Sequence, residues 1–164
     1  MSEERGTATL LTSYTEMTEL LLPNDTNQLG RALGGVVLHW MDIAGAIAAQ
    51  RFSNQLCVTA SMDHVDFISP IDLGEVVTVE AFVFDVGTTS IEVKVDVHAE
   101  DPKTDGERRE TTTSFFTFVA LDDAGHPTPV PTLETPTETQ ADLRERARRE
   151  RRDQLEAVVE QLPD

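Results

Sequence analysis

The chain has 164 residues, a length at which one domain is expected, and its 39% of hydrophobic residues is enough for a buried core. Thirty Asp and Glu residues face thirteen Lys and Arg residues, and the net charge of −17 argues against a nucleic-acid partner. Because carboxylates are dense and Lys is almost absent, we expect a halophilic protein whose charge repulsion is screened by concentrated salt.

The N-terminal stretch M-S-E-E-R-G-T-A-T has no basic region followed by an apolar one, so nothing marks the chain for secretion. We expect residues 1–9 to be frayed and residues 10–130 to form the domain. The lone cysteine, Cys57, cannot form an internal disulfide, which indicates a reducing, cytoplasmic compartment. The sequence has no metal-ligand spacing and no Gly-rich phosphate loop, so we expect neither a metal nor a cofactor.

Residues 10–22 alternate polar and apolar side chains, which predicts a first strand. Residues 23–35 are rich in Pro, Asn, Asp and Gly, as in a structured loop that leads into a helix. The stretch 34–51, G-G-V-V-L-H-W-M-D-I-A-G-A-I-A-A-Q-R, has apolar residues on every face of a helix, so other elements must cover it. Polar residues near its middle argue against a membrane span.

Asp42 stands out in the predicted helix, because an ionised carboxylate in apolar surroundings is costly unless it is paired or hydrogen-bonded. The nearest cations along the chain are Arg31 and Arg51, both far from it in sequence. One interpretation is an Asp that reaches solvent or a structural partner. The other is a carboxylate held in a cleft as a general base or nucleophile.

Period-two alternation and β-branched residues predict antiparallel strands over residues 75–86, 90–100 and 107–121, with a turn at 101–106. Residues 55–67 alternate small and apolar side chains, as expected of a strand that lies directly against the helix. One early helix followed by long antiparallel strands indicates an α+β architecture in which the sheet curls around the helix.

Residues 131–164 are expected to form a Pro-rich linker and an Arg-rich C-terminal helix, with the helix over residues 139–162. Six of the thirteen cations lie between Arg144 and Arg152. In so acidic a chain this cluster either complements the acidic body or binds phosphate through paired guanidinium hydrogen bonds.

Three segments resemble the hot-dog fold acyl-coenzyme A (acyl-CoA) thioesterases, the broad-specificity type of bacteria and of the animal cytosol. They read L-P-N-D-T-N-Q-L-G-R-A-L-G-G-V-V-L-H-W-M-D-I-A-G-A-I-A-A-Q-R, V-T-A-S-M-D-H-V-D-F-I-S-P-I-D-L-G-E-V-V and S-F-F-T-F-V-A-L-D-D-A-G-H-P-T-P-V-P. The resemblance covers about residues 10–155. It implies a long antiparallel sheet around one central helix, hydrolysis of an acyl-CoA thioester and a role in lipid metabolism.

By this resemblance Asp42 is the catalytic carboxylate, and Asn27, in the family's N-x-x-G spacing, is its partner from another protomer. Gly34 and Gly35 match the family's double glycine. Glycines admit a thioester to N–H groups at a helix N-terminus, where the dipole favours an oxyanion, so amides near Gly35 and Val36 are the expected donors. The alternative for the glycines is a tight turn with close helix packing.

Two neighbouring residues offer alternatives to this assignment. Asn24 replaces Asn27 if the loop is misaligned by one turn. His39 lies on the same helix face as Asp42, and hot-dog dehydratases pair an Asp with a His. Because the dehydratase His occurs in a different sequence context, we interpret His39 as a packing residue.

The phosphates of CoA would be repelled by an acidic surface, so we expect positive charge near the tunnel mouth. The candidates are Arg31, Arg51, Arg144, Arg148, Arg149, Arg151 and Arg152. The resemblance also implies a homo-oligomer, a dimer of hot dogs with a continuous sheet that assembles further to a hexamer.

Two other functions stay open. A non-catalytic acyl-CoA sensor would use the same tunnel, although a binder has no use for a carboxylate in an apolar helix. A hot-dog enoyl-CoA hydratase or dehydratase would share both the fold and the ligand. Thiol release compared with enoyl hydration on one panel of acyl-CoA substrates distinguishes these functions.

Overall fold

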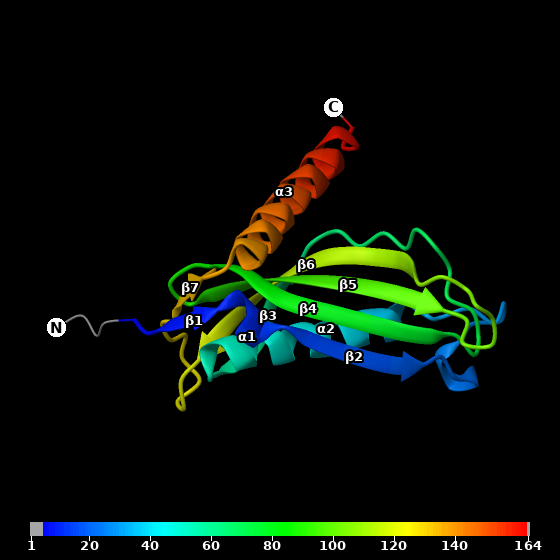
Figure 1. Ribbon diagram of the computed structural model, residues 1–164, viewed down its shortest axis with the longest axis horizontal. Coiled ribbons are helices and arrows are strands. Elements are labelled where there is room, and N and C mark those ends of the chain that lie inside the picture. The colour runs from blue at the N-terminus through cyan, green and yellow to red at the C-terminus, as the bar shows by residue number, and fades with distance from the viewer. Residues whose placement is uncertain (1–4, 164) are drawn as a thin grey trace.

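The computed structural model describes residues 5–163 of the chain. A five-stranded antiparallel sheet with the strand order β2-β4-β5-β6-β3 curls around the central helix α2 (Gly34–Ser53), as Figure 1 shows. The strands are β2 (Thr15–Leu20), β3 (Leu56–Met62), β4 (Val76–Val86), β5 (Ser90–Glu100) and β6 (Arg109–Leu121). This architecture confirms the α+β hot-dog fold expected from the sequence.

Along the strands buried residues alternate with partly exposed ones, which places one face of the sheet against α2. Every second residue of β5, from Ile91 to Ala99, is buried, and the residues between them are partly exposed. Helix α2 contributes Met41 and its small residues to the same core. At Gly45 a Cβ atom would lie 3.0 Å from the ring of Phe118, so the glycine allows the helix to approach the sheet closely.

The first predicted strand is shorter than expected. Helix α1 (Leu10–Ser13) precedes β2, and a short 3-10 helix, η1 (Pro23–Asp25), follows it. The first turn forms as a helix because Thr9 caps it, its side chain accepting a hydrogen bond from the N–H of Thr12. A strand over the whole of residues 10–22 is therefore wrong, and only its second half is extended.

The segment before the domain is paired rather than frayed as expected. Strand β1 (Thr7–Thr9) pairs in parallel with β7 (Thr132–Glu134), and the Arg5 guanidinium donates to the carbonyl oxygens of Val130 and Gly87. The Pro-rich segment supplies the backbone partners that order this end of the chain. Residues 1–4, the rest of the segment expected to be frayed, lie outside the described residues.

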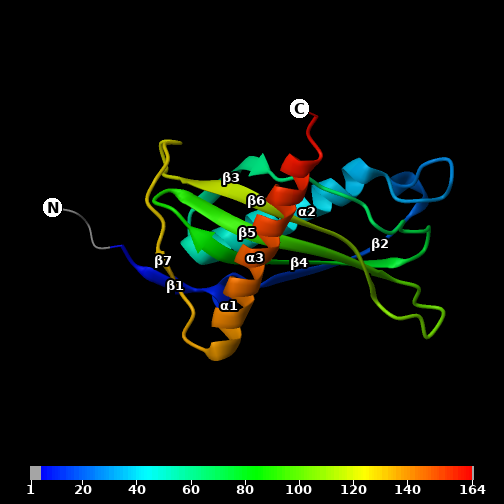
Figure 2. The same ribbon diagram turned by 90° about the horizontal axis from the view of Figure 1, so that it is seen from above.

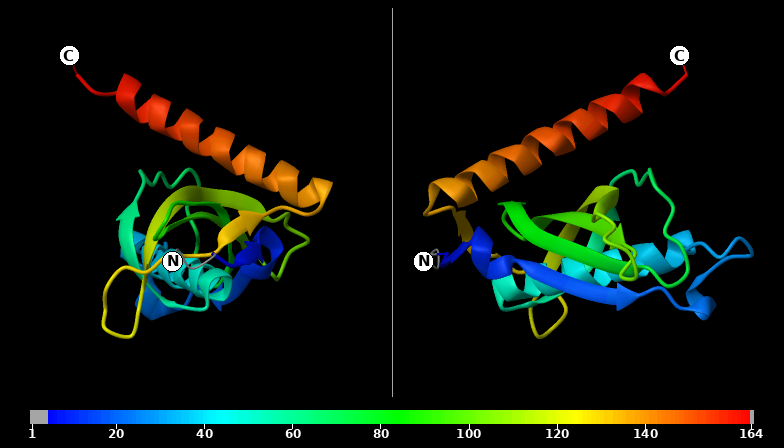
Figure 3. Two further views of the ribbon diagram at one scale, coloured as in Figure 1. Left: turned by 90° about the vertical axis from the view of Figure 1, so that its left-hand side faces the viewer. Right: turned by 45° about the vertical axis from the view of Figure 1, so that its right-hand side comes forward.

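Helix α3 (Glu138–Glu160) crosses the outer face of the sheet, opposite α2, as Figures 2 and 3 show. It confirms the helix predicted over residues 139–162. Its first half buries Ala147 in a small second core with Leu10, Phe84 and Phe115. None of the helices in the described residues is long and apolar enough to cross a membrane.

One side of α2 and the edge strand beside it stay uncovered. The side chain of Ile43 on α2 is 37% exposed, and Leu56 and Val58 on β3 are 62% and 43% exposed. Strand β3 is also an edge of the sheet, so its outer backbone groups have no strand partner. The expectation that other elements cover α2 completely is therefore not met within one chain.

Candidate active site

The carboxylate of Asp42 lies near the middle of α2, where it is half-buried. Its Oδ1 accepts a hydrogen bond of 2.6 Å from the hydroxyl of Thr59, because an ionised carboxylate can only accept. Thr59 stands at a register irregularity between β3 and β6, the kind of feature that re-aims side chains beside active sites. Oδ2 has no hydrogen-bond partner among the described residues, so this oxygen is open to a substrate or a water molecule.

Thr59 is the residue of this candidate site that the sequence analysis did not predict. The available signal was the prediction that residues 55–67 lie directly against the helix. A polar Asp in an apolar helix needs a donor from the element packed on it, and the hydroxyl residues of that strand were the natural source.

Asn27 is held in the loop before α2 by its own side chain. Its Oδ1 accepts hydrogen bonds from the N–H groups of Leu29, at 2.9 Å, and Arg31, at 3.2 Å. The backbone N–H of Asn27 also donates to the carbonyl oxygen of Arg31 at 2.8 Å. These contacts occupy the oxygen of the carboxamide, and the Nδ2 amide has no acceptor among residues 5–163, so it remains available as a donor.

A cavity of about 290 Å³ lies between this loop, the N-terminus of α2 and the segment that follows β3. Its lining includes Asn27, Arg31, Gly34, Val37 and Phe67. Asp42 does not line it, so one chain does not bring Asn27 and Asp42 together. Asn24 lies outside the cavity as well, which favours Asn27 as the site residue.

The first turn of α2 offers fewer free amides than expected. The N–H of Val36 donates to the carbonyl oxygen of Leu33 at 3.1 Å, so this expected oxyanion donor is already engaged within one chain. Gly34 and Gly35 have no N–H acceptor among residues 5–163. His39, interpreted as a packing residue, is exposed within one chain.

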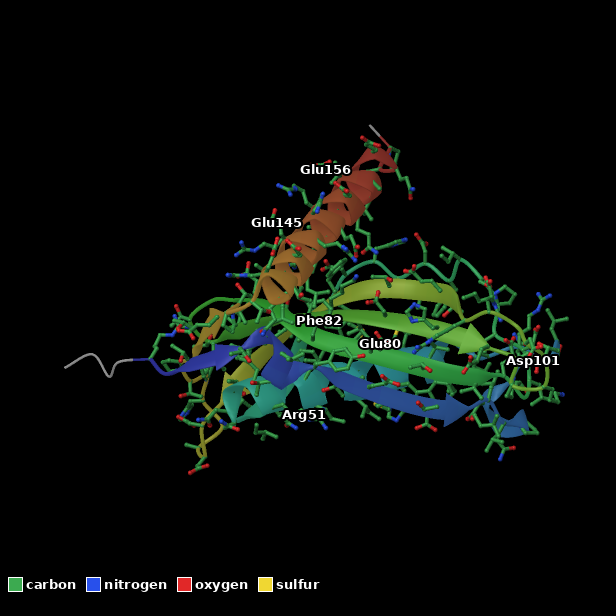
Figure 4. The ribbon with its side chains drawn as sticks, in the orientation of Figure 1. Arg51, Glu80, Phe82, Asp101, Glu145 and Glu156 are labelled. Atoms are coloured by element: carbon green, nitrogen blue, oxygen red, sulfur yellow. The ribbon has the colours of Figure 1, made fainter. Side chains whose placement is uncertain are left out.

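Two arginine candidates for the CoA phosphates lie at opposite ends of α2. Arg31 lines the cavity, and its side chain is 3.9 Å from the carboxylate of Asp72. Arg51 donates to the carbonyl oxygen of Tyr14 and to the hydroxyl of Thr15 instead. Figure 4 shows Arg51 on the far side of the sheet from the labelled residues of α3.

The arginines at the start of α3 bind the sheet. Arg144 and Arg148 lie 3.3 and 3.2 Å from Oδ1 of Asp85 in β4. Burial raises the pKa of Asp85, but the hydrogen bond and charge of Arg148, together with Arg144, hold this pKa below its ordinary value. This pairing supports the interpretation that the cluster complements the acidic body.

Further along α3 the arginines divide into two kinds. Arg151 contacts Asp63 at 3.1 Å and also pairs with Glu92. Arg149 and Arg152 are exposed and have no ion pair within residues 5–163. The arginine cluster therefore lies across the sheet from Asp42 of the same chain, and three of its six arginines are paired with carboxylates of the body.

A sheet curled around one helix that carries a hydrogen-bonded carboxylate defines a hot-dog enzyme. Residues 29–105 match the model of the thioesterase superfamily. The chain is 45% identical over 121 residues to the acyl-CoA thioester hydrolase YkhA of Bacillus subtilis, a match that covers 74% of this chain and 70% of that protein. It therefore belongs to the acyl-CoA thioester hydrolase family.

Solved structures agree with this family. An apo-hexameric acyl-CoA thioesterase superposes with a TM-score of 0.82 at 41% identity, covering 93% of this chain and 97% of that one. An acyl-CoA hydrolase of Staphylococcus aureus, in complex with butyryl-CoA, CoA and CoA disulfide, gives a TM-score of 0.76 at 31% identity over 94% and 97% of the two chains. That enzyme has also been solved with an Asn, an Asp or a Thr replaced by Ala.

Proposed function

We propose that this protein hydrolyses an acyl-CoA thioester to the free acid and CoA. The observation that carries the proposal is the Asp42 carboxylate, which has one oxygen held by Thr59 and the other free. Such a carboxylate is arranged to activate water or to attack a carbonyl carbon. The substrate class is supported by the membership of the acyl-CoA thioester hydrolase family and by the butyryl-CoA bound to the related S. aureus hydrolase.

The positions substituted in the S. aureus enzyme support the choice of residues. The Asn and Asp of that enzyme are 15 residues apart, and its Asp and Thr are 17 residues apart. Asn27, Asp42 and Thr59 have the same residue types at the same separations. Thr59 thus joins the two residues assigned from the sequence.

In this mechanism Oδ2 of Asp42 takes a proton from the attacking water or attacks the thioester carbon itself. The carbonyl oxygen then gains negative charge. The N–H groups of Gly34 and Gly35, at the positive end of the α2 dipole, donate hydrogen bonds that stabilise this charge. The free Nδ2 amide of Asn27 is a further donor. Collapse of the tetrahedral intermediate breaks the carbon–sulfur bond and expels CoA as a thiolate, which takes up a proton. If Asp42 has attacked directly, water then hydrolyses the mixed anhydride between the acyl group and Asp42, which releases the free acid and restores the carboxylate.

The proposal takes Asn27 and Asp42 of one site from different chains. One chain leaves them apart, and its edge strand β3 offers the self-complementary surface that a two-fold dimer requires. We propose a dimer that continues the sheet through β3, called the β3 dimer below, and that assembles further to a hexamer. Two related thioesterases, one of them from Yersinia pestis, are hexamers.

Among the arginine candidates, Arg31 is the one we assign to the CoA phosphates, because it lines the cavity and is largely exposed. We expect Arg31→Ala to raise KM for acyl-CoA about tenfold, or ~1.4 kcal/mol. A short thioester without the nucleotide should show little change, and Arg149→Ala is the matched control on α3. An equal rise of KM for both substrates would place the phosphate site elsewhere.

A direct assay distinguishes the three candidate functions. Purified protein is given a panel of saturated and enoyl-CoA substrates, and both thiol release and enoyl hydration are measured. We expect thiol release that disappears in Asp42→Asn. Binding without turnover would indicate a sensor, and hydration without thiol release would indicate a hydratase.

The buried lone Cys57 supports a reducing, cytoplasmic location for this activity.

A further inference from the structure

Residues 69–75, called the wall segment below, lead from the end of β3 into β4 and form one side of the cavity that contains Asn27. The residues of this segment that line the cavity are Ser69, Pro70 and Ile71. Figures 1 and 2 show the start of β4 and the loop before α2 at the same end of the molecule. The wall segment therefore belongs to the surroundings of the candidate site.

The wall segment also supports the loop of residues 23–35 that carries Asn27. Two backbone hydrogen bonds join them. The N–H of Ala32 donates to the carbonyl oxygen of Ile71 at 2.9 Å, and the N–H of Leu73 donates to the carbonyl oxygen of Gly30 at 2.8 Å. Because Asn27 is hydrogen-bonded within its own loop, its position follows the position of the wall segment.

One side chain, Arg109 at the start of β6, contacts the wall segment at both of its ends. Its Nη1 and Nη2 atoms donate to the two carboxylate oxygens of Glu75 at 2.6 and 2.7 Å. Its Nε donates to the hydroxyl of Ser69 at 3.0 Å, and Nη2 also donates to the carbonyl oxygen of Pro70 at 2.8 Å. Arg109 thus ties the wall segment to the sheet through four hydrogen bonds.

The carboxylate that faces Arg109 is itself fixed. Glu75 is only 6% exposed, and its Oε1 also accepts a hydrogen bond of 2.8 Å from the N–H of Asp72 within the segment. The hydrogen bonds from Arg109 hold the pKa of Glu75 below its ordinary value against the effect of burial, so the carboxylate stays ionised. Only the planar fork of a guanidinium can bind both carboxylate oxygens in this way.

We propose that Arg109 and Glu75 are positioning residues for the reaction. They fix the wall segment and, through it, place Asn27 for its action beside Asp42 of a second chain. Neither residue of the pair lines the cavity, so they act through the segment and not on the substrate. This inference rests on the proposed function and on the β3 dimer. It requires that a defect at Arg109 accompanies the chain that supplies Asn27.

The first test removes the fork and keeps the charge. We expect Arg109→Lys to lower thiol release about tenfold at the parent native mass, because a small displacement of a catalytic group is enough to slow a reaction. Arg108→Lys is the matched control, since the Arg108 side chain contacts only Glu80, at 3.0 Å, within the described residues. The control should stay within twofold of the parent. An equal effect of both substitutions would overturn the proposal.

A second variant changes the other half of the pair. Glu75→Asp keeps both charges and draws the carboxylate back by one methylene group, so that it no longer meets the fork. We expect the same direction of effect as in Arg109→Lys, and this variant takes its place if the Lys variant does not assemble. Parent turnover in Glu75→Asp would contradict the positioning role.

Mixed dimers show whether the effect reaches the site through Asn27. When an Arg109→Lys chain pairs with an Asp42→Asn chain, one site takes Asn27 from the second chain and Asp42 from the first. The defect does not reach this site, and we expect about half of the parent turnover. When an Arg109→Lys chain pairs with an Asn27→Ala chain, the only site with both residues takes Asn27 from the Arg109→Lys chain, and we expect about one-twentieth.

Equal turnover of these two mixed dimers, each isolated through two tags, would overturn the proposal, because a general loss of stability affects both alike. A mixed dimer of Asp42→Asn and Asn27→Ala chains, with Arg109 intact in both, tests the shared site itself. It keeps about half of the parent turnover if the site is shared and none otherwise. A failure of the proposed site is therefore seen in this dimer, whereas a failure of the positioning role is seen only in the other two.

Discussion

The Thr59 hydroxyl occupies one oxygen of the Asp42 carboxylate, and the other oxygen has no hydrogen-bond partner within residues 5–163. This hydrogen bond offsets the free-energy cost of placing a carboxylate in an apolar helix with no cation beside it. A short hydrogen bond from a neutral donor to a charged acceptor is stronger than one between two neutral groups. In the proposed mechanism the two residues have different roles, with Asp42 acting on the reacting atoms and Thr59 positioning Asp42.

Asp42→Asn keeps the side-chain volume and removes the charge. We expect kcat to fall by about 10²–10⁴, the usual contribution of a general base, with the assembly intact. Single-turnover thiol release checks the fall in rate, and native mass checks that the assembly is intact. Activity within threefold of the parent would exclude Asp42 from the chemistry.

The role of Thr59 is tested by a pair of substitutions. Thr59→Val removes the donor while keeping the shape, and we expect a fall in kcat of about tenfold, equivalent to one hydrogen bond of ~1.4 kcal/mol. Thr59→Ser restores the hydroxyl and should recover most of the loss. If the Ser variant is as slow as the Val variant, the methyl group matters and the hydrogen bond does not.

At the scale of elements, the long strands and the central helix could be predicted from the sequence. Along β5, for example, buried residues alternate with partly exposed ones, as the alternating sequence pattern indicates. The same reasoning failed at residues 10–22, where the Thr9 cap outweighs the alternating pattern. Asn27 and Asp42 were predicted from the sequence by resemblance. Thr59 was not, because its role depends on a tertiary contact between α2 and β3.

The contact of α3 with the sheet should depend on pH. Asp85 has a lowered pKa because of its arginine partners, so its contribution to stability is present above its ordinary pKa of about 4 and is lost as the pH falls through the lower folded value. We expect Asp85→Asn to lower Tm by about 2–4 °C near pH 7 and to converge with the parent in acid. Asp123→Asn, at an exposed turn, is the control. A Tm difference that stays constant down to acid pH would mean that the ion pairs contribute nothing.

For the whole molecule, the net charge sets the expected response to salt. Thirty carboxylates repel one another at low ionic strength, where the Debye length grows from ~3 Å at 1 M to ~30 Å at 0.01 M. If the protein is halophilic, as we expect, dialysis into dilute buffer should dissociate the oligomer or reduce the helix content. Native mass and circular dichroism across a KCl series check this. An unchanged Tm between dilute buffer and molar KCl would contradict the halophilic interpretation.

The central claim, a site shared between two chains, is tested most directly by complementation. Asp42→Asn and Asn27→Ala chains are each expected to be inactive, and the two are then co-expressed with distinct tags. In a mixed dimer one site receives both wild-type residues and the other receives neither, so random pairing predicts about one quarter of the parent turnover. A mixed dimer, isolated through both tags, that is as inactive as its parents would show that each site takes both residues from one chain.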